Sequence, residues 1–389
     1  MKKFVLSLAM CSAFGAALVG GIVRGSEISA FADDKLFDGC KSAYLCDYYS
    51  GECIYKSNEL ERLPIASVCK VMTLTLCLDA LDCGKISLSD SVTVSANAAG
   101  MGGSQVFLQS GLSYTYEQLL KSIVVCSAND SCVAVAESLC GSEQTFVSKM
   151  NEKAKELGCG DTLFTNCTGL PKPTQYSCAK DVALMYRNLI GHEEYFKYSK
   201  IWLEDFNHPD NRTTSMTNTN KLIRRYSSCD GGKTGYTGEA GFCLASTAKR
   251  DNLRLVSVVL GATTSDDRFD GAIKMFDYGF ANYTNKLVLD KDVNLPERLT
   301  VSSGKKPSIS VRPERSSYMF SKSDSTPNVT TSVILNDLKA PLSKGEVVGK
   351  IEIYKDGIIY DTVAVVASED VLKADYGDNL RKTAENWAL

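Results

Sequence analysis

The chain has 389 residues, 44% of them apolar, and a formal net charge of -3. This length allows two or three domains with sizeable cores. Charges of both signs are mixed and no basic block occurs, which argues against nucleic acid or an anionic membrane surface as a partner. A small molecule or a peptide is therefore the expected ligand.

The N-terminus has the pattern of a secretory signal peptide. Lys2 and Lys3 precede the uncharged stretch FVLSLAMCSAFGAALVGGIV, and the sequence AFA at 30–32 provides a small-residue cleavage site. These features predict a leader over residues 1–32. The apolar run is long for a signal core, so an uncleaved membrane anchor is the alternative. Either one places the rest of the chain outside the cytoplasm.

Hydrophobic periodicity and turn residues predict strands, then a helical block, then strands again. The stretch 42–56 is typical of two strands around a Ser-Gly turn. Residues 67–83 are apolar nearly all round, which predicts a helix buried in a core. Thr115 and Gln118 have the spacing of a capping box. Further helices are expected over 116–126, 130–140, 143–157 and 178–190, followed by two strands within 241–262 and a helix over 266–283.

Together these elements predict one α/β domain over residues 36–284, with a mainly antiparallel sheet and a helical lobe. From about residue 286 cysteine is absent and short alternating stretches dominate. An Asp-Gly pair marks the turn of a hairpin within 349–367. Residues 285–370 are therefore predicted to form a small all-β domain, with a tail over 371–389. The tail has a thin apolar stripe, so we expect weak membrane association at most.

The chain contains 15 cysteines, and those that follow the leader lie between Cys40 and Cys243. In an exported protein, many cysteines often indicate disulfides. Several of them fall inside apolar elements, however, where a thiol behaves as a small hydrophobe. No C-x-x-C pair or Cys/His cluster suggests zinc. We expect mostly free thiols and no metal site, with a Cys46–Cys53 disulfide as an open alternative.

Two short motifs in the helical block are candidates for chemistry. Ser67 and Lys70 lie one helical turn apart, where a neutral lysine could accept the serine proton and create a nucleophile. In Ser127-Ala128-Asn129, an extended turn would point a hydroxyl and an amide into one cleft. Each motif alone also fits a plain helix start or helix cap.

The third motif, Lys233-Thr234-Gly235, precedes or begins a strand in a glycine-rich stretch. Lys233 offers charge to a carboxylate, Thr234 offers a hydroxyl, and Gly235 leaves room for a substrate backbone. The alternative is a turn with a surface lysine. The order S-x-x-K, S-x-N, K-T-G is typical of class A β-lactamases and penicillin-binding proteins.

Beyond these motifs, the chain resembles a serine-type D-alanyl-D-alanine carboxypeptidase, a low-molecular-mass penicillin-binding protein of the peptidase S11 family. The similar stretches include PIASVCKVMT, SANDSCVAVAE, FTNCTGLP, TNTNKLI, DGGKTGYTGEAGFCLAS and, in the β domain, PLSKGEVVGKIEIYKDG. The resemblance implies a β-lactamase/transpeptidase-like fold for the first domain. It also implies a peptidoglycan stem peptide ending in D-Ala-D-Ala as substrate, acylation by β-lactam antibiotics, and no metal or cofactor.

The resemblance assigns a role to each matching position. Ser67 is expected to be the acyl-ester nucleophile, Lys70 its proton acceptor and Ser127 a proton relay. Substrate binding is expected at Asn129, Lys233, Thr234, Gly235, Tyr236 and Arg268. Backbone N–H groups of Ser67 and Tyr236 would form the oxyanion hole. Arg268 would meet the terminal carboxylate, its alternative being a surface arginine at a helix start.

Two positions depart from the family pattern. Cys69 stands where threonine is usual, and Ala128 stands where glycine is common. Both residues are small and are expected to be tolerated. A thiol at position 69 could make the site sensitive to oxidation, although a buried thiol is usually inert.

Three other functions fit the sequence less well. A Ser-His-Asp hydrolase is disfavoured because only His192 and His208 occur, neither of them in a motif and both expected at the surface. A class A β-lactamase would carry an E-x-x-L-N stretch, which is absent between Asn129 and Lys233. A non-catalytic wall-binding protein on the same fold is disfavoured because every catalytic position is intact. The sequence leaves open a vegetative or sporulation role, and carboxypeptidase or endopeptidase action.

Overall fold

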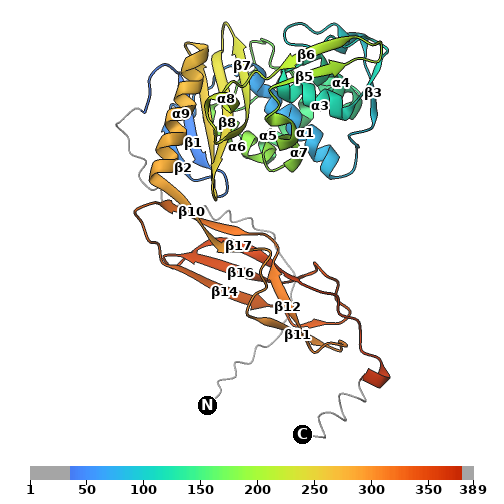
Figure 1. The fold of residues 1–389 in the computed structure, drawn as a ribbon, viewed down its shortest axis with the longest axis vertical. Helices are drawn as coiled ribbons and strands as arrows, with labels where there is room; N and C mark the ends of the chain where they lie inside the picture. The colour runs from blue at the N-terminus through green and yellow to red at the C-terminus, as the bar shows by residue number, and fades with distance from the viewer. Residues whose placement is uncertain (1–35, 379–389) are drawn as a thin grey trace, which may run out of the picture.

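The computed structural model describes residues 36–378 of the chain. The predicted leader over 1–32 and the end of the predicted tail lie outside the described residues. The described chain forms an α/β part followed by an all-β part (Figure 1). In this described range, no helix has both the length and the apolar character needed to cross a membrane.

The α/β part is built on a five-stranded sheet with the order β2-β1-β9-β8-β7, in which every neighbouring pair is antiparallel. Its strands are β1 (Ser42–Asp47), β2 (Cys53–Ser57), β7 (Cys229–Thr237), β8 (Gly241–Arg250) and β9 (Leu253–Ala262). The central strand β9 is mostly apolar and buried along nearly its whole length, because both of its faces are covered. Its Leu255 and Val259 join the core on one face, whereas Val256 and Val258 join the core on the other.

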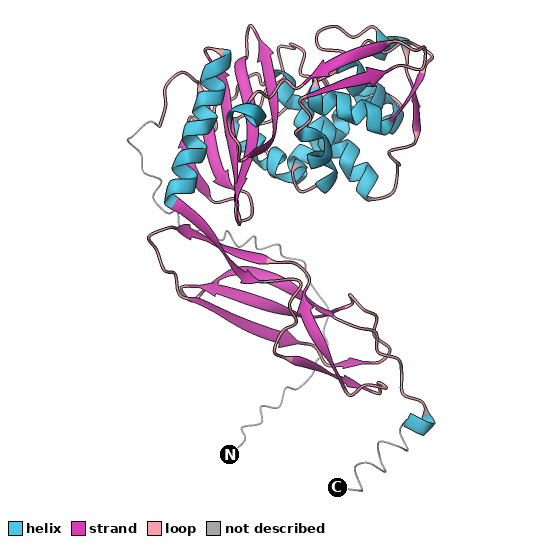
Figure 2. Cartoon of the chain, viewed as in Figure 1, coloured by secondary structure: helices cyan, strands magenta, loops and turns pink. Residues whose placement is uncertain are grey.

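Helices cover the two faces of this sheet (Figure 2). On one face lie α8 (Leu222–Arg225) and the long α9 (Ser265–Asn282). The helical lobe on the other face contains α1 (Lys70–Asp82), α2 (Ala96–Ala99), α3 (Tyr116–Val125), α4 (Asn129–Cys140), α5 (Glu143–Glu156), α6 (Ala179–Leu189) and α7 (Glu193–Ser199). The predicted capping box is confirmed: Thr115 and Gln118 exchange hydrogen bonds at the start of α3.

Two small two-stranded antiparallel sheets lie on the helical lobe. Strand β3 (Ser91–Thr93) pairs with β4 (Ser113–Thr115), and β5 (Leu203–Asn207) pairs with β6 (Thr213–Thr217). The sequence did not predict them because each strand is short and mostly polar. In β5 and β6 only Phe206 and Met216 are buried.

The all-β part has its own core and a six-stranded sheet with the order β14-β16-β17-β12-β11-β15. Its strands are β10 (Tyr283–Leu289), β11 (Arg298–Ser302), β12 (Ser308–Pro313), β13 (Ser317–Lys322), β14 (Val329–Leu335), β15 (Leu338–Lys339), β16 (Val347–Lys355) and β17 (Ile358–Ala367), with β10 and β13 forming a separate pair. The predicted hairpin turn is confirmed, since Asp356 and Gly357 have φ angles of 53° and 83° between β16 and β17.

Direct contacts join the two parts. Asn285 of β10 donates a buried hydrogen bond to Asp47 Oδ1 at 2.7 Å. The rings of Tyr49 and Tyr318 stack with their centroids 4.7 Å apart. The Asn285–Asp47 hydrogen bond and the stacked tyrosines thus hold the two parts against each other.

Candidate active site

Ser67 and Lys70 meet at the start of α1, as the S-x-x-K spacing predicts. The expected helix over 67–83 begins later, because Ala66–Cys69 form a 3-10 turn and Lys70 is the first residue of α1. Lys70 Nζ lies 2.8 Å from Ser67 Oγ and donates to the carbonyl oxygen of Thr168 at 2.5 Å. The lysine is fully buried, so its amine has no contact with solvent.

The surroundings of Lys70 favour a neutral amine. Burial lowers the pKa of Lys70 from its ordinary 10.5, because an ammonium ion loses its hydration there. The hydrogen-bond partners of its Nζ in the described structure are a hydroxyl and a carbonyl, and neither carries a compensating negative charge. A neutral amine 2.8 Å from a serine hydroxyl can accept its proton.

Ser127 and Lys233 form a second serine–lysine pair. Lys233 Nζ lies 2.8 Å from Ser127 Oγ and donates to the Thr234 carbonyl oxygen at 3.0 Å. Burial, and then repulsion from Lys70 when that lysine is protonated, lower the pKa of Lys233 well below 10.5. The pair therefore joins the S-x-N turn to strand β7. The expectation that K-T-G precedes or begins a strand is wrong, since Cys229–Thr237 place it in the middle of β7.

The S-x-N turn is not extended, which corrects the predicted geometry. Ser127 has a φ of 65°, in the left-handed region, and Asn129 is already the first residue of α4. The hydroxyl and the amide therefore face the site through a strained residue at a helix start rather than through strand alternation. Strain of this kind in a non-glycine residue is often found at functional sites.

The Asn129 side chain is oriented by the loop that precedes β4. Its Nδ2 donates to the Gly102 carbonyl oxygen at 2.7 Å, and its backbone N–H donates to Ser104 O at 2.7 Å. Its Oδ1 is buried and has no hydrogen-bond partner in the described residues. A Cβ at Gly103 would lie 2.8 Å from Asn129 Nδ2, so glycine is required for this approach. A buried acceptor without a partner is uncommon, and it marks Asn129 as a candidate for ligand binding.

Gly235 lets strand β7 close against the turn that carries the nucleophile. A Cβ at this position would lie 2.6 Å from the Ile65 carbonyl oxygen and 3.1 Å from the Ser67 nitrogen. We expected the missing side chain at Gly235 to leave space for a substrate backbone. The turn that carries Ser67 occupies part of that space. The neighbouring Tyr236 is 58% exposed, and its ring stacks on Phe242 with centroids 4.3 Å apart.

Thr234 of β7 and Arg268 of α9 each make a hydrogen bond that links β7 to a neighbouring segment. Thr234 Oγ1 donates to Thr219 Oγ1 at 2.7 Å. Arg268 is buried at the start of α9, and its Nη1 donates to the Gly235 carbonyl oxygen at 3.2 Å. Burial lowers the pKa of Arg268 to about 10. Its Nε has no partner in the described structure. Arg268 is thus a buried neighbour of the strand and not a surface residue.

Two contributors to the site have no predicted role in the sequence. The Thr168 carbonyl reaches Lys70 because Asn166 folds its loop: Asn166 Oδ1 accepts from Gly169 N at 2.7 Å, and Nδ2 donates to Leu170 O at 2.8 Å. Thr219 is the second contributor. Both lie in stretches that resemble the family, FTNCTGLP and TNTNKLI, and this resemblance was their only signal.

The expectation that both histidines lie at the surface is wrong for His208. It is 5% exposed and is enclosed by the β5–β6 hairpin, which the sequence did not predict. His192 is partly exposed and pairs with Asp79 and Asp82 of α1. Neither ring hydrogen-bonds to the serine–lysine pairs.

The cysteines of the described chain are all free thiols, Cys69 among them. Cys46 and Cys53 face each other across β1 and β2 without a bond between them. Among residues 36–378, no group of three or more His, Cys, Asp or Glu side chains is arranged to hold a metal ion. Cys69 is fully buried with its Sγ 3.4 Å from the Asn166 carbonyl oxygen.

Iodoacetamide is expected to modify the exposed Cys83 well before Cys69 in the folded protein. Cys69 is buried, so the reagent cannot reach it. Burial also raises the pKa of its thiol, so little of the reactive thiolate forms. Timed alkylation followed by peptide mass spectrometry measures the order, with urea-denatured protein as the control in which both react. Early modification of Cys69 would show that the nucleophile turn opens to solvent.

The fold and the two serine–lysine pairs define the class of the protein: a serine-type hydrolase with the fold of penicillin-binding proteins. The profile of the D-alanyl-D-alanine carboxypeptidase family, peptidase S11, matches residues 35–264. The profile of the C-terminal domain of penicillin-binding protein 5 matches residues 283–373.

Individual relatives agree over nearly the whole chain. D-alanyl-D-alanine carboxypeptidase DacF of Bacillus subtilis is 38% identical over 378 residues, which are 95% of this chain and 97% of that protein. Penicillin-binding protein 5 of Haemophilus influenzae has a TM-score of 0.67 and 30% identity, covering 88% of this chain and 100% of that one. Penicillin-binding protein 3 of Streptococcus pneumoniae has a TM-score of 0.69 and 26% identity, covering 86% and 100%.

The chain therefore belongs to the D-alanyl-D-alanine carboxypeptidase family. This confirms the predicted family, the predicted fold with its all-β C-terminal domain, and the enzyme class, a serine-type carboxypeptidase.

Proposed function

We propose that this carboxypeptidase removes the terminal D-alanine from peptidoglycan pentapeptide stems through an acyl-enzyme on Ser67. The observation that carries the proposal is the 2.8 Å contact between Ser67 Oγ and the amine of a fully buried Lys70. Desolvation of that amine provides a base where the serine needs one.

In the proposed reaction, Ser67 Oγ attacks the carbonyl carbon of the penultimate D-alanine, and its proton passes to Lys70 Nζ. The oxyanion of the tetrahedral intermediate faces the backbone N–H groups of Ser67 and Tyr236. The C–N bond then breaks, and Ser127 relays a proton to the departing amine. Water attacks the resulting ester, the serine regains its proton, and the tetrapeptide stem leaves.

Substrate binding is proposed to use the groups around β7. The unpartnered Asn129 Oδ1 would accept a substrate N–H. The terminal carboxylate would meet Thr234, with Lys233 and Arg268 supplying positive potential from beneath the strand. The contact of Arg268 Nη1 with the Gly235 carbonyl oxygen supports a role beside the strand, where the end of an extended peptide would lie.

We also propose that the enzyme acts outside the cytoplasm, exported by the leader over residues 1–32, in the synthesis and remodelling of the cell wall and hence in cell shape. Residues 36–284 would be the catalytic domain and 285–370 the β domain, with weak membrane association through the tail over 371–389. β-Lactams would acylate Ser67 because their strained amide takes the place of the D-Ala-D-Ala bond.

The test is incubation with a pentapeptide ending in D-Ala-D-Ala, followed by mass spectrometry. We expect a tetrapeptide and free D-alanine, and no cleavage of a matched peptide ending in L-Ala-L-Ala. In parallel, a fluorescent penicillin is expected to leave a lasting adduct on the protein. An unchanged pentapeptide, or rapid penicillin turnover without an adduct, would contradict the proposal.

A further inference from the structure

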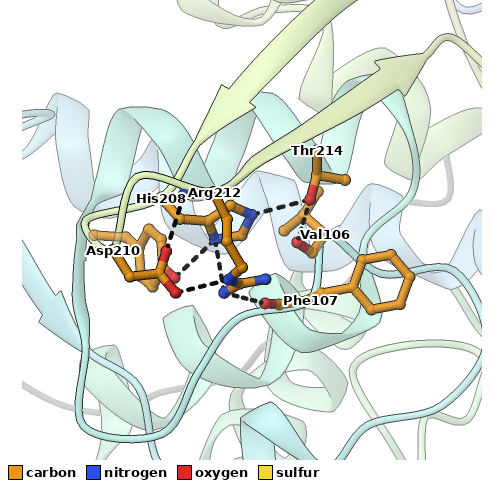
Figure 3. Close-up of polar contacts among 7 residues, drawn as sticks. Val106, Phe107, His208, Asp210, Arg212 and Thr214 are labelled. Atoms are coloured by element: carbon orange, nitrogen blue, oxygen red, sulfur yellow. Dashed lines mark hydrogen bonds and ion pairs between the residues drawn. The ribbon is translucent and has the colours of Figure 1, made fainter.

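The β5–β6 hairpin carries a polar cluster, centred on the buried His208, that the proposed reaction does not use. It consists of His208, Arg212 and Thr214 and is called here the hairpin cluster (Figure 3). His208 lies edge-on to Phe206 and Tyr114, with ring centroids 5.0 and 5.8 Å away. A buried imidazole needs both nitrogens satisfied, and here both are.

The hydrogen bonds of the cluster determine the tautomer of His208. The Thr214 hydroxyl donates to the Val106 carbonyl oxygen at 3.2 Å, so it must accept from His208 Nε2, which lies 3.0 Å away. Nδ1 is then the acceptor, and the Tyr114 hydroxyl at 2.9 Å and Arg212 Nη2 at 3.5 Å both point toward it. The ring is therefore neutral, with its proton on Nε2.

The charges around the ring are consistent with a neutral histidine. Burial and the Arg212 guanidinium lower the pKa of His208, against the weaker influence of Asp210 and Asp130. Asp210 accepts from Arg212 Nε at 2.7 Å, which turns the other end of the guanidinium toward the ring.

The hairpin cluster holds one side of the loop over residues 101–112, and helix α4 holds the other. Thr214 donates to Val106 O, and Arg212 Nη2 donates to Phe107 O at 3.3 Å (Figure 3). From α4, the buried Asp130 carboxylate accepts from the backbone N–H groups of Val106 at 3.1 Å and Leu108 at 3.0 Å. Phe107 lies between these hydrogen bonds and has a φ of 63°, which an unrestrained phenylalanine avoids.

The same loop determines the orientation of the Asn129 carboxamide. Its Gly102 and Ser104 carbonyls bind the side chain and the backbone of Asn129, both at 2.7 Å. Because Nδ2 is committed to Gly102, Oδ1 must face the opposite way, where it has no partner in the described residues. Only Gln105 separates Ser104 from Val106, so the residues held by the hairpin cluster and these carbonyls belong to one short stretch of chain.

We propose that the hairpin cluster clamps the loop over 101–112 and thereby orients Asn129, so that His208 is a positioning residue for acyl transfer. The inference rests on the proposed reaction at Ser67. His208 touches neither the nucleophile nor its base, and it acts through Thr214 and the loop.

The test compares acylation rates by a fluorescent penicillin in the full chain. His208→Phe keeps the ring but removes the donor to Thr214, and it is expected to slow acylation about tenfold through misplacement of Asn129. His208→Gln, whose amide N–H can reach Thr214, is expected to recover most of the lost rate. Thr214→Val removes the next link and is expected to match His208→Phe. Thr213→Val is the control, because this exposed neighbour bonds only to Asn207 of its own hairpin.

A double-mutant cycle separates positioning from a general loss of structure. Asn129→Ala removes the group that the clamp orients, so His208→Phe is expected to slow acylation no further in that background. Thermal unfolding checks each variant, and Thr214→Val alone carries the test if His208→Phe does not fold.

Three outcomes would overturn the proposal. His208→Phe and Thr214→Val could both acylate at the wild-type rate, or the rate losses of His208→Phe and Asn129→Ala could multiply in the double variant. In the third, His208→Gln would be as slow as His208→Phe. Failure of the wild-type chain to be acylated would instead contradict the proposed function. The two failures are therefore distinguishable.

Discussion

Replacing Ser67 by alanine is expected to abolish D-alanine release and penicillin labelling. The change removes the oxygen that forms the acyl bond, and binding plus the oxyanion hole cannot replace a nucleophile, so the rate should fall by about 10⁴-fold or more. Folding should be preserved, because the serine is only partly buried and loses a single side-chain hydrogen bond, to Lys70, that contributes about 1 kcal/mol. Mass spectrometry of the peptide and gel fluorescence of the labelled protein measure both effects.

The matched control is Ser148→Ala, on the exposed face of α5, where the hydroxyl bonds only to the Gln144 carbonyl of its own helix. This variant should cleave and label at the wild-type rate. A labelled Ser67→Ala protein would be informative in a different way. An adduct mapped to Ser127 would mean that the second serine–lysine pair, and not the first, supplies the nucleophile.

Much of the fold follows from local patterns that need no tertiary information. The Asp356-Gly357 turn has positive φ at both positions, and the capping box at Thr115 forms as its spacing requires. These features depend on residues within one turn or one strand of each other. They are therefore readable in sequence.

The details of the site depend on contacts between distant segments, so they were harder to predict from the sequence. Strand alternation predicted the wrong turn at Ser127, because the chain enters α4 from a left-handed residue. The distant Lys233 binds its hydroxyl, and the loop at 101–112 binds the nearby Asn129. Gly235 was expected to make room for a substrate. It also makes room for the turn at Ser67, which is far away in the sequence. His208 was placed at the surface because β5 and β6 each bury a single side chain, too weak a pattern to predict the hairpin.

The spacing of S-x-x-K nevertheless predicted the serine–lysine contact, because three residues of 3-10 or α-helix bring the two side chains together equally well. What it could not supply is the reason the lysine is neutral and can accept a proton. That depends on burial beneath the Asn166–Leu170 loop, which is remote in sequence.

Lys70→Met is expected to slow acylation by about 10³-fold, since general-base catalysis by a positioned group contributes about 10²–10⁴-fold. Methionine follows the path of the lysine stem and fills nearly the same volume. The fold loses the hydrogen bond to Thr168 O, a cost of about 1 kcal/mol, and is relieved of a buried amine. Lys274→Met, on the exposed side of α9, is the control and should acylate normally.

The pH dependence distinguishes a base from a packing residue. Raising the pH deprotonates Lys70, so wild-type acylation should rise with pH and level off below 10.5, because burial lowers the pKa of this amine. Lys233, whose pKa is also lowered, is present in both proteins. If the rise of the rate with pH is lost in Lys70→Met, the rise belongs to Lys70. Stopped-flow labelling across the pH range measures the rate. A limb that persists in the variant would transfer the role of base to Lys233.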